Sequence, residues 1–346
     1  MSLALAGKRA ALLPGAWARN DLWRRARAVP SLDLRFADNK SLTDAVTGQS
    51  LVTFTRASSG TYVGSDGLVK TAVTNLFTRS EEFNDAAWTK TGSATITANQ
   101  IAAPNGTATA DLLTAAATTT FSGAVRQAPT VVSGISYTIS CYVKKSNWRY
   151  IGLRFNTSVF GATERVPFYD FDTDTLSNGG NTGAAISRQI VGDGWVRLVM
   201  TFTATTTSGN ADVWLTLSDG ATQTAKAGTE SVYIWGAQLE QSSTVGEYTP
   251  TTSTINSAPR FDHNPTTGES LGLLVEEQRT NLLLRSELIG GTSWVNQNSI
   301  SVTTNSNEVN DPAGGVTASK LVAGSSTSQT LQAITLAASQ YTGTVY

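Results

Sequence analysis

The amino-acid sequence predicts an all-β chain with a jelly-roll β-sandwich, flanking β-hairpin segments and the start of a second, truncated sandwich. Between residues 74 and 250, short segments of alternating polar and apolar residues follow one another, with turn residues between them and almost no helical periodicity. Charged residues make up only 15% of the chain, and the abundant Thr suits a pleated sheet. A jelly roll is a common arrangement of so many antiparallel strands.

An internal repeat predicts the second sandwich. The stretch from Thr74 begins TNLFTRSEE, and the stretch from Thr280 begins TNLLLRSEL. The residues that recur 206 positions later, or 208 after a short slip, include Thr74 and Thr280, Arg79 and Arg285, Trp88 and Trp294, and Leu113 and Leu321. Because the period is far longer than that of a solenoid, the repeating unit is a whole domain.

The chain begins with a basic arm. Residues 1–30 carry six Lys or Arg side chains and one Asp, with two Trp among them. We expect this N-terminal arm to dock on a partner, and a terminus without an anchor is the alternative. Residues 31–73 follow as a β-hairpin segment, in which Asp66-Gly67 lies between two short apolar runs and predicts a tight turn.

The complete sandwich is expected over residues 74–250. Its exception to strand periodicity is Ser80 to Trp88, where Ser80 is placed to cap a single helical turn. Alternation within the later strands predicts that Trp195 and Trp235 point into the core.

A connector and a partial copy follow the sandwich. Residues 251–279 are expected to form a hairpin around the turn at Asn264-Pro265. Residues 280–346 form the incomplete second sandwich, since the repeat stops early at Tyr346. We therefore expect one complete domain and the first part of another, with more of the second beyond Tyr346.

Composition excludes several classes of function. The formal net charge of −1 gives no electrostatic case for binding nucleic acid, and no run approaches the ~20 apolar residues of a membrane span. With Cys141 and His263 as the only residues of their types, a zinc site of nitrogen and sulfur ligands cannot be built. No nucleophile elbow, glycine-rich phosphate loop or dinucleotide fingerprint occurs. We predict that the protein is not an enzyme.

One acidic run imitates a metal motif. Asp170, Asp172 and Asp174 have the spacing of the first three ligands of a calcium loop. The sixth position is Thr175 where such a loop needs Gly, and the twelfth is Asn181 where it needs Glu. We interpret the run as a strand that leads into a turn.

After these exclusions, ligand binding is the class of function that the sequence still favours. Aromatic side chains can stack on the apolar faces of sugar rings while hydroxyl and amide side chains bond the sugar hydroxyls. The stretch KKSNWRYIGLRF follows a turn and begins a strand, which would place it at a sandwich rim. We therefore select Asn147, Trp148, Arg149 and Tyr150 as candidate glycan contacts.

Several stretches resemble a known family. NLFTRSEEFNDAAW is similar to the opening strand and turn of carbohydrate-binding jelly-roll modules of the family 4/9/22 type. GWVRLVMTFTA and VYIWGAQLEQSS resemble the closing strands of such modules in bacteriophage tail and virion proteins. GLLVEEQRTNLL looks like the segments that accompany them in phage structural proteins. The resemblance covers roughly residues 31–346 and implies a jelly-roll sandwich, a virion location and recognition of host-surface glycans.

The same resemblance implies a structural calcium ion. Such modules commonly end in a strand whose aspartate pair helps to hold it. Here Trp235 and Gly236 stand near that pair. Glu82 and Glu240 are the carboxylates that could contribute to the calcium site, and no other cofactor is expected.

Together these observations favour a non-enzymatic phage virion protein, such as a tail or head fibre or related appendage. Its N-terminal arm would contact other virion proteins, and its jelly roll would bind host-surface carbohydrate. Because single sugar sites are usually weak and gain from avidity, we expect a homo-oligomer. Two alternatives stay open: a ligand-free structural spacer or decoration domain, and the targeting module of a larger polysaccharide-degrading enzyme.

Overall fold

The structure is a computed structural model. It describes residues 31–118, 123–155, 167–178, 184–205, 207, 211–214, 226–276, 281–284, 286–336 and 342–343. The predicted N-terminal arm, residues 1–30, lies outside the described residues. Every regular element in the described ranges is a β-strand, which confirms the predicted all-β class. The described part of the chain contains no helix of the length and apolarity that a membrane crossing requires.

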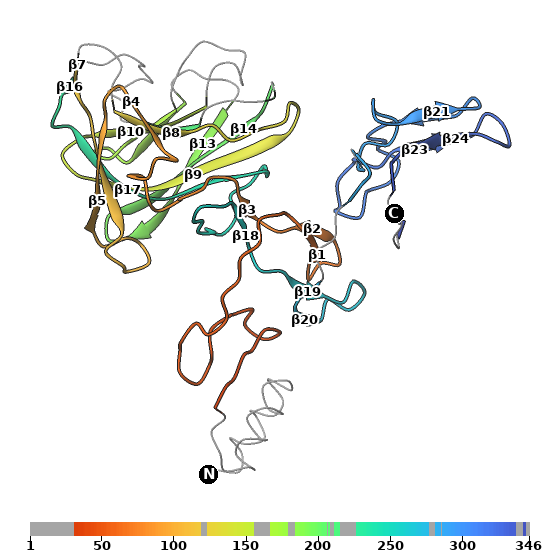
Figure 1. Cartoon of the computed structure of the whole chain (residues 1–346), viewed down its shortest axis with the longest axis horizontal. Coiled ribbons are helices and arrows are strands. Elements are labelled where there is room, and N and C mark those ends of the chain that lie inside the picture. Colours follow the sequence, from red (N-terminus) through yellow and green to blue (C-terminus); the bar gives the residue numbers. More distant parts are fainter. Residues whose placement is uncertain are drawn as a thin grey trace. The chain divides into compact units, whose positions relative to one another are not determined.

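The chain divides into two compact units. One comprises Thr55–Gly60 and Ala72–Ala258, and the other comprises Met1–Phe54, Thr61–Thr71 and Pro259–Tyr346. The first unit is the sandwich, which has two six-stranded antiparallel sheets. Figure 1 shows it and labels strands of both sheets. We call them sheet A and sheet B.

Sheet A has the strand order β12-β11-β10-β15-β8-β4. Its strands are β4 (Thr89–Thr91), β8 (Ala124–Gln127), β10 (Tyr150–Phe155), β11 (Phe168–Asp170), β12 (Thr175–Ser177) and β15 (Ala211–Trp214). Sheet B has the order β13-β14-β9-β17-β6-β5. Its strands are β5 (Thr95–Ile101), β6 (Ala110–Thr114), β9 (Ser136–Lys145), β13 (Ala184–Gly192), β14 (Trp195–Thr203) and β17 (Ser231–Glu240). Two short pairs complete the unit, β3 (Thr74–Asn75) with β18 (Asn256–Ser257) and β7 (Ala117–Thr118) with β16 (Lys226–Ala227).

The core lies between the two sheets because side chains alternate along each strand. In β9, Tyr137, Ile139, Cys141 and Val143 point into this core and are buried. The residues between them, such as Tyr142, point to the outer face of sheet B. This alternation is the two-residue period from which the sequence predicts the strands.

The outer face of sheet B is covered by two other segments of the chain. Trp195 donates its indole N–H to the carbonyl of Ala102 at 3.2 Å, and Arg197 donates to the carbonyl of Gly246 at 2.7 Å. Trp195 and Trp235 are therefore buried, but in a small cluster on the outer face and not in the core between the sheets. The predicted burial of these two side chains is confirmed, but the cluster that buries them is formed by covering segments distant in sequence and not by the opposite sheet.

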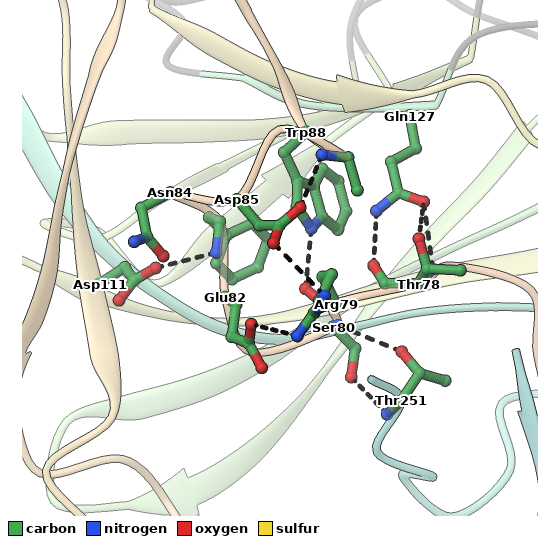
Figure 2. A network of polar contacts seen from close by, with 12 residues as sticks. Thr78, Arg79, Ser80, Glu82, Asn84, Asp85, Trp88, Asp111, Gln127 and Thr251 are labelled. Carbon is green, nitrogen blue, oxygen red and sulfur yellow. Dashed lines mark hydrogen bonds and ion pairs between the residues drawn. The ribbon is translucent and has the colours of Figure 1, made fainter. Parts of the chain in front are cut away.

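The turn that opens the sandwich is shown in Figure 2. The predicted helical turn is wrong: between Arg79 and Trp88 three successive hydrogen bonds join residues three apart, and none of these residues is helical. Ser80 does not cap, since its hydroxyl accepts from the backbone N–H of Thr251 and bonds Tyr248. Asp111, only 1% exposed, accepts the backbone N–H of Phe83 at 2.9 Å and holds the turn from β6.

The second repeat reproduces part of this architecture. β21 (Val295–Gln297) pairs with β24 (Gln329–Leu331) as β4 pairs with β8, and β22 (Ser301–Thr303) pairs with β23 (Lys320–Val322) as β5 pairs with β6. The start of a second sandwich is thus confirmed. Among the described residues no strand takes the place of β15 or β17 beside these pairs. As a result Leu321 is 47% exposed, whereas its counterpart Leu113 is fully buried.

Two hairpins flank the sandwich in sequence, as predicted. They consist of β1 (Thr61–Val63) with β2 (Val69–Thr71) and β19 (Phe261–His263) with β20 (Ser270–Leu273). The two hairpins are joined by hydrogen bonds. The backbone N–H of Val63 donates to Asp262 at 2.7 Å, and the carbonyl oxygen of Val63 lies 2.9 Å from Nδ1 of His263. His263 is 4% exposed and serves this contact.

The single cysteine gives a simple test of the sandwich core. Cys141 is fully buried in β9, and burial raises the pKa of its thiol to about 12. The thiol therefore stays protonated near pH 8, and only the thiolate reacts. We expect a thiol-specific disulfide reagent to react at least ~100-fold more slowly with the folded chain than with the chain in guanidinium. Equal rates, followed by absorbance, would contradict this placement.

Candidate functional site

A hollow of about 390 Å3 opens in the sandwich where several strands end. Its lining comes from the end of β9, from β11 and the turn after it, and from the β13–β14 hairpin. The lining residues are Lys145, Tyr169, Phe171, Asp174, Ile190, Gly194, Trp195 and Val196. A concave site with aromatic walls and a few polar groups is the usual form of a small-ligand site.

The aromatic wall is held rigidly. Tyr169 and Phe171 meet edge to face, with ring centroids 5.0 Å apart and an interplanar angle of 72°. Tyr169 is buried and donates its hydroxyl to Asp174 at 2.7 Å. Burial, followed by this hydrogen bond, raises the pKa of Tyr169 to about 12, so the hydroxyl stays protonated at neutral pH. Phe171 is half-buried and therefore presents part of its ring.

An apolar wall stands on the β13–β14 hairpin. Ile190 is 67% exposed and lines the hollow. The backbone turns at Gly194 (φ +76°), where only glycine is comfortable. Trp195 follows at once and is anchored by its bond to Ala102. The turn thus sets Ile190 and Trp195 around the same hollow.

Ion pairs surround the hollow. Arg149 binds Asp170 with two parallel hydrogen bonds, Nε to Oδ1 at 2.8 Å and Nη2 to Oδ2 at 2.7 Å. Lys145 pairs with Asp172, and Arg188 pairs with Asp174 at 2.5 Å. The acidic run is thus a set of partners for cations from β9, from β13 and from the turn after β9. This agrees with its interpretation as a strand that leads into a turn.

The Arg149–Asp170 pair predicts a pH-dependent contribution to stability. The hydrogen bonds from Arg149 hold the pKa of Asp170 well below its ordinary value. A lowered carboxyl pKa stabilises the fold above the unfolded pKa, and this stabilisation is lost as the pH falls towards the folded pKa. We expect Asp170→Asn to lower the melting temperature by several degrees near pH 7 and by clearly less near pH 3. Equal losses at both pH values, by circular dichroism, would contradict the pairing.

The four residues selected from the sequence lie beside the hollow and not in its lining. Asn147 has a structural role, since its side chain accepts from the backbone N–H of Ser231 and donates to the carbonyl of Thr229, both at 2.7 Å. Trp148 is half-buried against the core. Tyr150 packs edge to face on Phe168, with centroids 5.7 Å apart. Arg149 reaches the rim through Asp170.

The glycan contacts predicted from the sequence do not include four residues that line the hollow: Tyr169, Phe171, Asp174 and Ile190. The signal for three of them was present in YDFDTD, where aromatic and acidic residues alternate before a turn. What the sequence does not show is that the β13–β14 hairpin comes to lie against this turn. The hollow exists only because of that long-range contact.

The residues in the structure do not fit the implied calcium ion. Glu82 pairs with Arg79 at 2.9 Å. Glu240 is buried and accepts from the side chain of Gln238 and the backbone N–H of Gly246, and burial raises its pKa. Among the described residues, no three His, Cys, Asp or Glu gather as metal ligands.

Aromatic side chains occupy the position in β17 at which the resemblance places the aspartate pair. Trp235 and Tyr248 pack with centroids 4.9 Å apart. The hydroxyl of Tyr248 lies 2.7 Å from that of Ser80 and donates to Glu81 at 3.2 Å. Besides Glu240 in the strand itself, the carboxylate that reaches this cluster is thus Glu81 and not Glu82, and burial raises the pKa of Glu81.

Comparisons with known proteins give only remote matches. No protein-family model matches the chain, and no curated protein matches it. Solved structures with partial similarity include the enzymatically active domain of tailspike protein 4 of bacteriophage CBA120 (13% identity, 48% of this chain and 21% of that chain, TM-score 0.28). A second is a CBM22-1–GH10 fragment of the Clostridium thermocellum endo-1,4-beta-D-xylanase 10B (12% identity, 51% of this chain and 29% of that chain, TM-score 0.28). A third is the CBM22-1 xylan-binding domain of a Paenibacillus barcinonensis protein (15% identity, 50% of this chain and 98% of that chain, TM-score 0.30).

The similarity spans less than a third of the first two of these structures. At such identities and TM-scores it carries no weight for the site. The assignment of a two-sheet jelly-roll sandwich rests on the strand order described above.

Proposed function

We propose that the sandwich binds carbohydrate in the hollow beside Phe171 and that the chain is a non-enzymatic component of a phage virion. The observation that carries the binding half is the convergence of aromatic, apolar and charged side chains on one hollow of about 390 Å3. Phe171 and Ile190 both line the hollow and supply aromatic and aliphatic surface for the apolar face of a sugar. Asp174 and Lys145 supply a carboxylate and an ammonium group for the sugar hydroxyls.

The virion half of the proposal is supported by the resemblance of GLLVEEQRTNLL and its neighbours to phage structural segments. In this proposal the chain belongs to a tail or head fibre or related appendage, where many copies act together. A homo-oligomer would convert weak single sites into firm attachment to host-surface glycans. The N-terminal arm would hold the chain to other virion proteins. Detection of the chain by mass spectrometry in purified particles tests this half.

An array of bacterial surface polysaccharides, probed with the full chain, tests the binding half. We expect concentration-dependent binding to a subset of the polysaccharides, with weak affinity for a single site and stronger retention when the chain is displayed in several copies. Binding to none of them would leave the role of a ligand-free spacer. Release of reducing ends from a bound polysaccharide would overturn the non-enzymatic part of the proposal and favour a module of a polysaccharide-degrading enzyme.

A further inference from the structure

The charges around the hollow are balanced. Four cationic side chains lie there with four carboxylates, and each cation pairs with at least one of them; Arg149 also lies 3.6 Å from Asp172, which Lys145 shares. The pairs are Lys144 with Asp193 at 3.2 Å, Lys145 with Asp172, Arg149 with Asp170 at 2.7 Å, and Arg188 with Asp174 at 2.5 Å. The formal charge of this set is therefore zero.

Within the lining itself, one cation and one carboxylate face the ligand. Lys145 is 43% exposed, and its ammonium group is already bonded to Asp172. Asp174 is 55% exposed and lines the same hollow. An incoming carboxylate or phosphate would have to compete with Asp172 for Lys145 and would also face Asp174. Like charges brought together in this way disfavour binding, whereas sugar hydroxyls can bond both groups.

We infer that the hollow selects uncharged sugars and that Asp172 and Asp174 are the residues that reject acidic ones. This inference rests on the proposed carbohydrate-binding function. It assigns the acidic run a role in specificity, because each carboxylate neutralises a cation that would otherwise attract a uronate or a phosphorylated sugar. Specificity achieved by a repulsive group is a common complement to attractive contacts.

The experiment compares neutral polysaccharides with polysaccharides that carry uronate or phosphate, on the same bacterial array and with the full chain. Wild type is expected to bind neutral members at least about tenfold better than acidic ones at low salt. Asp172→Asn, which leaves Lys145 without its carboxylate, is expected to gain about tenfold for acidic members, and this gain should fade as salt rises. Lys145→Ala in the Asp172→Asn background should abolish the gain.

Asp193→Asn is the matched control. It removes a carboxylate from the same rim, but Asp193 does not line the hollow and its side chain is 86% exposed. It should leave the preference unchanged. Unfolding curves check that each variant folds, which is expected because Asp172 and Asp193 are both on the surface.

The outcomes separate the two claims. Binding of acidic polysaccharides as tightly as neutral ones by wild type, or no gain in Asp172→Asn, would overturn the selectivity while leaving carbohydrate binding intact. Binding of no polysaccharide by wild type or by any variant would overturn the binding function and the selectivity with it.

Discussion

Trp88→Ala is expected to destabilise the sandwich by about 3–5 kcal/mol, the range for truncating a buried aromatic side chain. Trp88 is 1% exposed and packs on Phe77 and Phe83, with ring centroids 5.1 and 4.8 Å away. Its indole N–H also donates to the carbonyl of Arg79 at 2.8 Å, as Figure 2 shows, so truncation leaves an acceptor without its partner. We expect the melting temperature of the sandwich to fall by roughly 10 °C.

The repeat provides the matched control. Trp294 stands at the corresponding position of the second copy and is only half-buried. Trp294→Ala is expected to leave the sandwich transition within about 1 °C of wild type, since Trp294 belongs to the other compact unit and not to the sandwich core. Calorimetry of the full chain measures both variants. An equal fall in both would show that the two tryptophans do not differ in packing as the structure describes.

The second large effect concerns binding. Phe171→Leu is expected to weaken carbohydrate binding about tenfold, because leucine fills similar space but has no ring face to stack on a sugar. Phe171 is half-buried in the wall of the hollow beside Tyr169, so this substitution should preserve the fold better than alanine would. Affinity electrophoresis with a polysaccharide that wild type binds provides the measurement.

Trp148→Ala and Tyr150→Ala are the comparison, since they remove the aromatic residues that the sequence selected. They do not line the hollow, and we expect less than a threefold loss of affinity once folding is confirmed. If these variants lose binding and Phe171→Leu retains it, the sugar is held at the predicted rim and the hollow is not the site.

The candidate site shows how far its residues can be predicted from sequence patterns. The stretch KKSNWRY is selected because a turn with aromatic residues starts a strand there; in the structure Lys145 lines the hollow and Arg149 pairs with the acidic run. The residues chosen within it are mostly structural, since Asn147 satisfies backbone groups of the strand beside it. A turn with polar and aromatic residues marks a rim, but only packing decides which of them face solvent.

Three features can be predicted from the sequence without the structure: the β class, the hairpin at Asp66-Gly67 and the repeat that begins at Thr74 and Thr280. Each is a local property, set by alternation, by turn residues or by self-similarity along the chain. Two features follow from tertiary contacts instead: Trp195 and Trp235 lie on the covered outer face of sheet B, and Phe171 and Ile190 line the same hollow. These features depend on contacts between segments far apart in sequence. The two-residue period of a strand predicts which side chains share a face of the sheet, but it does not predict which segment covers that face.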